Sequence, residues 1–173
     1  MPIPLYGYIY HEFVNNFMGN QICMALDINE YSFPYRLAYS FSCGDMFTLV
    51  LNNNYDIMDA WCLDVAVDKE VVLSFINVLN EWRRKQKEYL HQGKMIEPLS
   101  YKVRENSFIH EDRSILKDKA VLTAAFNSDN GNMQFLINYN LNKETVEFEE
   151  EHEFYLNADL SKTCTKSGWT FVG

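Results

Sequence analysis

The chain has 173 residues, of which 47% are hydrophobic and 23% charged, and it carries a formal net charge of −9. This composition supplies enough apolar side chains to bury a core, so it excludes an intrinsically disordered chain. The acidic balance argues against a nucleic-acid-binding protein, and no stretch approaches the ~18 consecutive apolar residues of a transmembrane helix. We therefore expect neither nucleic acid nor a membrane as a partner. We also expect no cofactor, since the sequence has no Gly-rich phosphate loop and no dinucleotide-binding fingerprint.

The cysteines and the N-terminus indicate the compartment. Cys23, Cys43, Cys62 and Cys164 form no C-x-x-C pair, which favours free thiols over a metal site. Residues 1–13 lack the charged region and the small-residue cleavage site of a signal peptide. The chain as given is therefore expected to be cytoplasmic.

Charge divides the chain into three zones: residues 1–66 carry a net charge of −6, residues 67–119 carry +2, and residues 120–173 carry −5. The first zone opens with an apolar, aromatic run at residues 2–10, which predicts a buried strand that ends at His11-Glu12.

Two further elements are expected before residue 55. The spacing of apolar residues over 33–41 predicts a short helix that stops at Gly44. Residues 46–51 form a second apolar run, and the three asparagines at 52–54 predict a turn after it.

The second zone holds the clearest helical pattern, at residues 68–92. Asp68 can cap this helix and Gly93 suits its C-terminal end. Its apolar residues recur every three to four positions, at Val72, Phe75, Ile76, Leu79, Trp82 and Tyr89. The basic run Arg83, Arg84, Lys85 and Lys87 reads either as a nucleic-acid patch or as the solvated outer face of a packed helix, and the acidic surroundings favour the second reading.

In the third zone the apolar period changes from 3.6 to 2. Residues 121–126 and 133–139 predict a hairpin around an Asn-rich loop, and residues 146–148, 154–156 and 168–172 predict further short strands. Residues 95–118 show no clear period and are interpreted as a linker or an edge strand. The predicted fold class is an α/β part followed by a small antiparallel β-sandwich packed against the helix at 68–92.

His11-Glu12 is the sharpest candidate for chemistry. A buried strand that ends in a polar pair is how β/α barrels present active-site residues. A glutamate there can serve as acid, base or nucleophile, and a neighbouring histidine can tune it. A charged strand end is nevertheless common, and no second histidine completes a zinc motif.

The sequence resembles the C-terminal part of large bacterial glycoside-hydrolase-like proteins, in which a TIM barrel precedes a β-sandwich. The resemblance rests on PLYGYIYHEF at residues 4–13, FPYRLAYSFSCGD at residues 33–45, GKMIEP at residues 93–98 and AAFNSDNGNMQFLINYNLNKETVEF at residues 124–148. It implies that residues 1–97 are the last strand or strands and helices of a TIM-type barrel, and that residues 98–173 are the β-sandwich.

The resemblance also implies a function. The chain is expected to be part of a glycoside hydrolase and to contribute one side of a carbohydrate-binding cleft. Glu12 and His11 are the candidate catalytic residues, and Tyr10, Asn16 and Asp45 are the candidate substrate contacts. Hydrolysis needs two carboxylates, so the partner of Glu12 is expected upstream, with Asp45 as a weaker candidate within the chain.

A complete barrel needs about 250 residues, so this reading makes the chain a fragment or one piece of a split gene, inactive alone. A signal peptide could then lie upstream, and the protein would be secreted or periplasmic. The alternative is a non-catalytic module that binds carbohydrate or protein. In either case the absent barrel portion should leave an apolar surface around residues 3–50, which would favour self-association.

Overall fold

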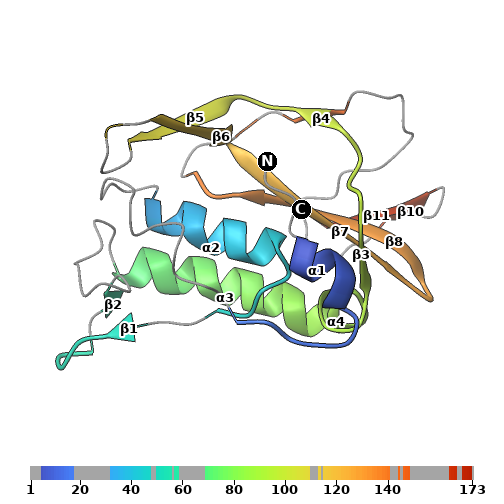
Figure 1. Ribbon diagram of the computed structural model, residues 1–173, viewed down its shortest axis with the longest axis horizontal. Coiled ribbons are helices and arrows are strands. Elements are labelled where there is room, and N and C mark those ends of the chain that lie inside the picture. Colours follow the sequence, from blue (N-terminus) through green and yellow to red (C-terminus); the bar gives the residue numbers. More distant parts are fainter. Residues whose placement is uncertain are drawn as a thin grey trace.

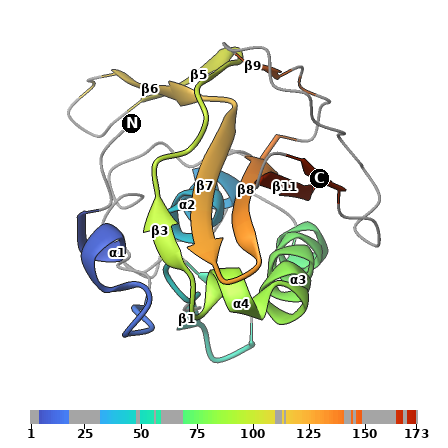
Figure 2. The same cartoon turned by 90° about the vertical axis from the view of Figure 1, so that its right-hand side faces the viewer.

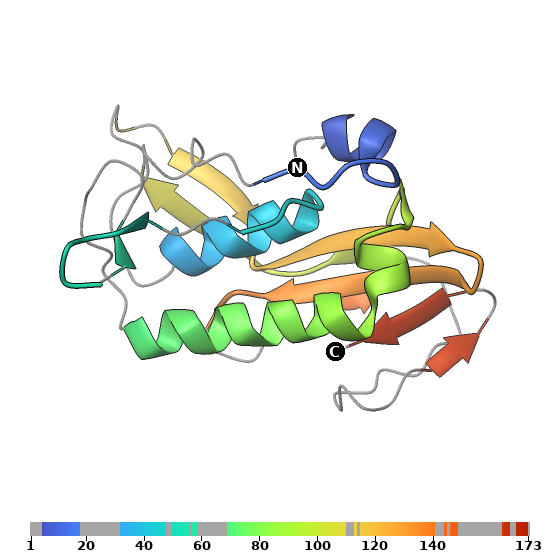
Figure 3. The ribbon, with the colours of Figure 1, turned by 90° about the horizontal axis from the view of Figure 1, so that it is seen from below.

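The computed structural model describes residues 5–17, 32–47, 50–55, 57–58, 69–109, 113, 115–140, 144, 146–148, 164–166 and 169–172. These residues form a mixed arrangement of helices and open sheets, with a β-rich C-terminal part as expected. Helices α2 (Ser32–Ser42) and α3 (Lys69–Lys85) lie side by side on one face of a five-stranded sheet, as Figures 1 and 3 show. None of the helices described is both long and apolar enough to span a membrane.

The five-stranded sheet has the order β10–β11–β8–β7–β3. Its centre is the predicted hairpin, confirmed as β7 (Val121–Ser128) paired antiparallel with β8 (Gly131–Asn138). On one side β3 (Lys94–Ile96) pairs antiparallel with β7 (Figure 2). On the other side β11 (Trp169–Val172) pairs with β8, and β10 (Cys164–Lys166) pairs antiparallel with β11.

The pairing of β11 with β8 is parallel, so the prediction of a purely antiparallel module is wrong at this position. A tight hairpin forces antiparallel pairing, whereas a long connection allows a strand to enter in either direction. About thirty residues of chain separate β8 from β11, so no tight turn between these two strands sets their relative direction.

Three small two-stranded sheets surround the main sheet. They are β1 (Val50–Leu51) with β2 (Ile57–Met58), β4 (Tyr101–Lys102) with β9 (Glu147–Phe148), and β5 (Glu105–Ile109) with β6 (Ile115–Lys119). The interpretation of residues 95–118 as a linker or an edge strand is confirmed only at its start, where β3 forms the edge of the main sheet, because β4, β5 and β6 follow in the same span. Each strand there buries only one side chain, for example Phe108 in β5, so the pattern is too short to show a period.

The strand predicted over residues 2–10 is not found: residues Leu5–Tyr10 form helix α1. The run of aromatic residues fits either period, and the structure buries Gly7 and His11, which lie four positions apart on one helical face. Gly7 lets the helix approach closely, because a Cβ at this position would overlap the carbonyl oxygen of Cys43 and press on Met95. The argument that His11-Glu12 ends a buried barrel strand therefore loses its structural basis.

The helix predicted over residues 68–92 is divided in two. Helix α3 ends at Lys85, the backbone turns at Gln86, and a short helix α4 (Lys87–Leu90) follows. The second helix ends at Leu90, and the turn after it reaches Gly93, where a Cβ would overlap the carbonyl group of Tyr89. The expected helix end at Gly44 is confirmed, with a backbone φ of 80° after α2.

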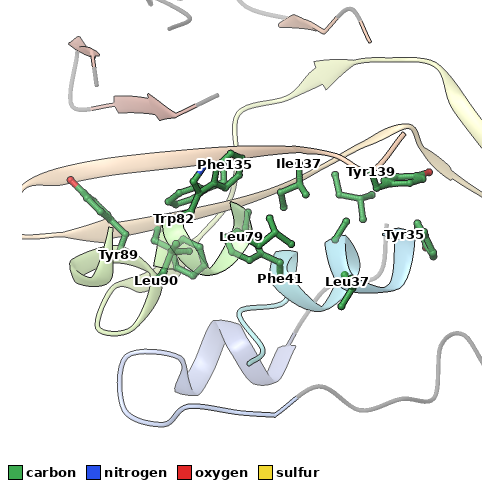
Figure 4. Close-up of a cluster of buried hydrophobic side chains, with 14 of the residues drawn as sticks. Tyr35, Leu37, Phe41, Leu79, Trp82, Tyr89, Leu90, Phe135, Ile137 and Tyr139 are labelled. Atoms are coloured by element: carbon green, nitrogen blue, oxygen red, sulfur yellow. The ribbon is translucent and has the colours of Figure 1, made fainter. Parts of the chain in front are cut away.

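The main core lies between the helices and the sheet (Figure 4). Three cross-strand pairs of the hairpin belong to this core: Leu122 with Ile137, Ala124 with Phe135, and Phe126 with Met133. The rings of Phe41 and Trp82 contact the ring of Phe135, with centroid separations of 5.9 and 5.8 Å. Burying such aromatic side chains is the largest favourable contribution that a core of this size offers.

Backbone pairing crosses the boundary expected between residues 97 and 98. Strand β3 precedes that position and pairs with residues Ala125–Asn127 of β7. Helix α2 is also joined to β6 by a buried hydrogen bond, which the Tyr35 hydroxyl donates to Oδ2 of Asp118 at 2.9 Å. The two halves of the chain therefore share one sheet and one core.

Candidate functional site

The two candidate catalytic residues point in different directions. His11 is buried, with 6% of its surface exposed, and its ring lies 4.6 Å from the ring of Phe126. Nδ1 of His11 is 2.7 Å from the carbonyl oxygen of Gly93; because that oxygen only accepts, Nδ1 carries the hydrogen. This bond ties the end of α1 to the turn after α4.

The surroundings of His11 favour the neutral form of its ring, although the hydrogen bond to Gly93 opposes this effect. Burial lowers the pKa of His11, and the positive charge of Arg83 lowers it further. Gly44 lies against the ring, and a Cβ at Gly44 would overlap it. The geometry describes a histidine that positions two segments of the chain rather than one that faces a ligand.

Glu12, in contrast, is exposed and lines a polar cleft of about 440 Å³. The cleft lies between the turn after α1, the α4 segment and the tip of the β7–β8 hairpin. Its other lining residues are Glu88, Gln92, Lys94, Asn127, Ser128, Asp129 and Asn130.

The cleft is lined by hydrogen-bonding groups held in place by one another. Nδ2 of Asn130 donates to Oε2 of Glu88 at 2.7 Å, and Nδ2 of Asn127 donates to Oδ1 of Asn132 at 2.7 Å. Carboxylates accept and amides both donate and accept, which matches the hydroxyl groups of a polyol such as a sugar.

Asn16 and Asp45, two of the candidate substrate contacts, lie together away from this cleft. Nδ2 of Asn16 donates to Oδ1 of Asp45 at 2.8 Å, and the guanidinium of Arg83 donates to the backbone carbonyl of Asp45. Burial raises the pKa of Asp45, while Asn16 and Arg83 oppose that shift. Asp45 does not line the Glu12 cleft, so the structure does not present these two carboxylates to the same space.

Tyr10, the remaining candidate, belongs to an exposed apolar surface. Its ring lies 5.0 Å from that of Tyr6 on the outer side of α1. The surface continues through the following turn, where Phe13 is 75% exposed and Phe17 is 63% exposed. We call this the α1 surface, and it comprises Leu5, Tyr6, Ile9, Tyr10, Phe13, Val14 and Phe17.

The α4 segment and the hairpin tip are the parts of the cleft that the sequence patterns missed. The hairpin loop is recognisable as a turn, and Glu88 is recognisable as a residue of a helix. Only the tertiary structure brings them close to Glu12, because Glu88 is 76 positions away along the chain and the hairpin tip is about 117 positions away. No local spacing could have signalled this juxtaposition.

The part of the chain that the structure describes offers neither a metal site nor a reactive thiol. No group of three or more His, Cys, Asp and Glu side chains within it could hold a metal ion. Cys43 is a free thiol whose pKa burial raises to about 12, so it is inert as a nucleophile near neutral pH. The side chains of Cys23, Cys62 and Cys164 lie outside the described residues.

Comparisons of the chain with protein-family models, with curated proteins and with solved structures found no match.

Proposed function

We propose that this chain is part of a carbohydrate-active protein of the glycoside-hydrolase type, in which it contributes one side of a sugar-binding cleft. The observation that carries the proposal is the position of Glu12 on the wall of a polar cleft of about 440 Å³. The resemblance of residues 4–13 to a glycoside-hydrolase segment singles out the same residue.

The chemistry of the cleft supports a neutral sugar as the ligand. Amide groups of Gln92, Asn127 and Asn130 can bind sugar hydroxyls without requiring a charge on the ligand. The three carboxylates of the lining outnumber its one ammonium group, that of Lys94. An acidic sugar would therefore meet repulsion, whereas a neutral sugar would not.

Under this proposal Glu12 acts as one of two carboxylates, or as a substrate contact. Glycosidic hydrolysis places its two carboxylates about 5–9.5 Å apart across the scissile bond, depending on the stereochemical outcome. The second carboxylate would come from another part of the protein. That part would also pack against the α1 surface. His11 would serve as a positioning residue for the turn that carries Glu12.

The test is calorimetric titration of the purified chain with neutral mono- and disaccharides, including glucose, galactose, mannose and their β- and α-linked dimers. We expect binding of at least one of them, with Glu12→Gln weakening it about tenfold or more, because a carboxylate–hydroxyl hydrogen bond is worth ~1.5–3 kcal/mol. Glu105→Gln is the matched control, since Glu105 is exposed on β5 and does not line the cleft.

Absence of binding for the whole panel, or an equal loss in the Glu105→Gln control, would reject the cleft as a sugar site. We also expect no turnover of aryl glycosides by the chain alone, because under this proposal the second catalytic carboxylate lies elsewhere in the protein and is neither Asp129 nor Glu88, whose carboxylate accepts a hydrogen bond from Asn130. Robust turnover would instead show that the described chain holds a complete active site.

The second candidate is a non-catalytic module that binds another protein, and the α1 surface favours it. Seven large apolar side chains exposed on one short segment exceed the scattered apolar residues normal for a protein surface. The variant Phe13→Ser separates the two candidates. It should abolish association with a protein partner at the α1 surface, and it should leave sugar binding in the Glu12 cleft unchanged.

A further inference from the structure

Arg83 departs from the solvated position expected for the basic run at the end of α3. Only 3% of its surface is exposed, and its guanidinium carbon lies 4.8 Å from the ring centroid of Phe41 and 5.1 Å from that of Phe47. The two aromatic faces stabilise the cation, although burial still lowers the pKa of Arg83 to about 10. Arg83 is therefore charged near neutral pH.

The hydrogen-bonding capacity of this buried cation is incompletely used. One terminal nitrogen donates to the carbonyl of Asp45, and the other contacts the sulfur of Met46 at 3.4 Å. Nε of Arg83 is buried and has no hydrogen-bond partner within the described part of the chain. Among the described residues no carboxylate forms an ion pair with Arg83, although the charge of Asp45 acts on it from nearby. A buried donor left in this state is costly and points to a partner of opposite charge.

A cavity of about 490 Å³ lies beside Arg83, where α3 meets α4. Arg84, Lys87 and His91 line it together with Arg83, and none of the described residues that line it is acidic. We call it the Arg83 cavity. It is separate from the Glu12 cleft, although Gln92 borders both.

The nearby carboxylates do not neutralise this concentration of positive charge. Glu81 is 3.6 Å from Arg84 and 3.2 Å from Lys85, but these are solvent-exposed pairs within one helix, which contribute little. Cations are also favourable in the last turn of a helix, which explains the exposed Arg84 and Lys85. That effect does not explain why Arg83 is buried with an unused donor.

From this geometry we propose that the Arg83 cavity binds an oxyanion of the phosphate or sulfate type, free or carried on a larger ligand. A planar guanidinium matches the spacing of two oxyanion oxygens, and Arg84 and Lys87 supply further charge-assisted donors at the rim. This inference does not depend on the proposed sugar site, because the two sites share only Gln92 and the charged residues of one do not line the other.

The test is titration of the full chain with inorganic phosphate, followed by ³¹P NMR and by thermal unfolding, against sodium chloride of equal ionic strength. We expect saturable binding and a rise in Tm that chloride does not reproduce. Since mutation of the buried Arg83 could unfold the protein, the variant is Arg84→Gln/Lys87→Gln, whose targets are exposed. It should weaken phosphate binding about fivefold or more, the loss expected for charge-assisted hydrogen bonds.

Lys102→Gln/Lys117→Gln is the matched control, because it removes the same charge from β4 and β6, which do not line the cavity. Glucose 6-phosphate, compared with glucose and with inorganic phosphate, distinguishes a phosphorylated ligand from the free ion. The proposal fails if chloride matches phosphate, if the control variant loses as much affinity, or if glucose alone displaces phosphate from the cavity.

Discussion

The helix-covered face of the sheet and the α1 surface are built from the same kinds of side chain but use them in opposite ways. On the sheet, Phe135 is fully buried against Phe41 and Trp82, and Phe126 is fully buried against Phe135 and His11. On α1 and the following turn, Phe13 and Phe17 remain mostly exposed. The first region stabilises the fold of this chain, while the second has apolar area to bury against something else. The residues between these two regions, His11 and Glu12, join the fold to the exposed face.

The largest expected effect tests whether the two regions differ in stability. Phe135→Ala should lower the free energy of unfolding by about 3–5 kcal/mol, because it leaves a cavity among packed rings. Phe13→Ala should change it by no more than about 0.5 kcal/mol, since Phe13 is exposed. Urea unfolding of both variants gives the comparison directly. Similar losses at both positions would show that the α1 surface is part of the folding core.

A smaller effect is expected at the junction of the two regions. Gly44→Ala should destabilise the chain by about 1–3 kcal/mol, because the backbone there has a φ of 80° and the new Cβ would overlap the ring of His11. Gly131→Ala is the matched control: φ is 107° in the β7–β8 turn, remote from His11 in the sequence and on another element. Thermal unfolding should show the larger loss for Gly44→Ala, and an equal loss would mean that the contact with His11 is unimportant.

The smallest effect concerns pH. Because burial lowers the pKa of His11 in the folded state, the unfolded chain takes up a proton at higher pH than the folded chain does. Stability should therefore fall as the pH decreases from 7.5 to 6.0, by at most about 1 kcal/mol for this histidine. His91, whose pKa burial also lowers, adds a change of the same sign.

The variant His11→Asn should reduce this pH dependence without removing it, as measured by urea unfolding at both pH values. If the free energy of unfolding depends on pH as steeply in this variant as in the original chain, His11 is not the source of the pH dependence. The raised pKa of Asp45 acts in the opposite direction, because a carboxyl group with a raised pKa in the folded state makes that state more stable as the pH falls.

The elements that the sequence predicts well are those with a clear turn or end signal. The hairpin of β7 and β8 has eight residues in each strand around a recognisable Asn130-Gly131 turn, and α2 is followed by a glycine with positive φ. Helix α1 is only six residues long, and its aromatic run fits a strand equally well. The break at Gln86 has no proline or glycine to mark it.

Prediction of the candidate site was limited for a different reason. Glu12 is recognisable as a polar residue after an apolar run, but the groups that face it come from α4 and the hairpin tip, far away in the sequence. The burial of Arg83 was also missed, because a basic run at a helix end is normally solvated and only the rings of Phe41 and Phe47 reveal the exception.

The central claim is that the Glu12 cleft binds a neutral sugar, and the most direct measurement is an NMR titration of the isotopically labelled chain with the best ligand of the saccharide panel. We predict that the side-chain amide signals of Gln92, Asn127 and Asn130 shift together and saturate at one ligand concentration, while that of Asn106, which is hydrogen-bonded to Tyr139 elsewhere in the structure, stays in place. Shifts confined to the α1 surface, or none at the three cleft amides, would contradict the account.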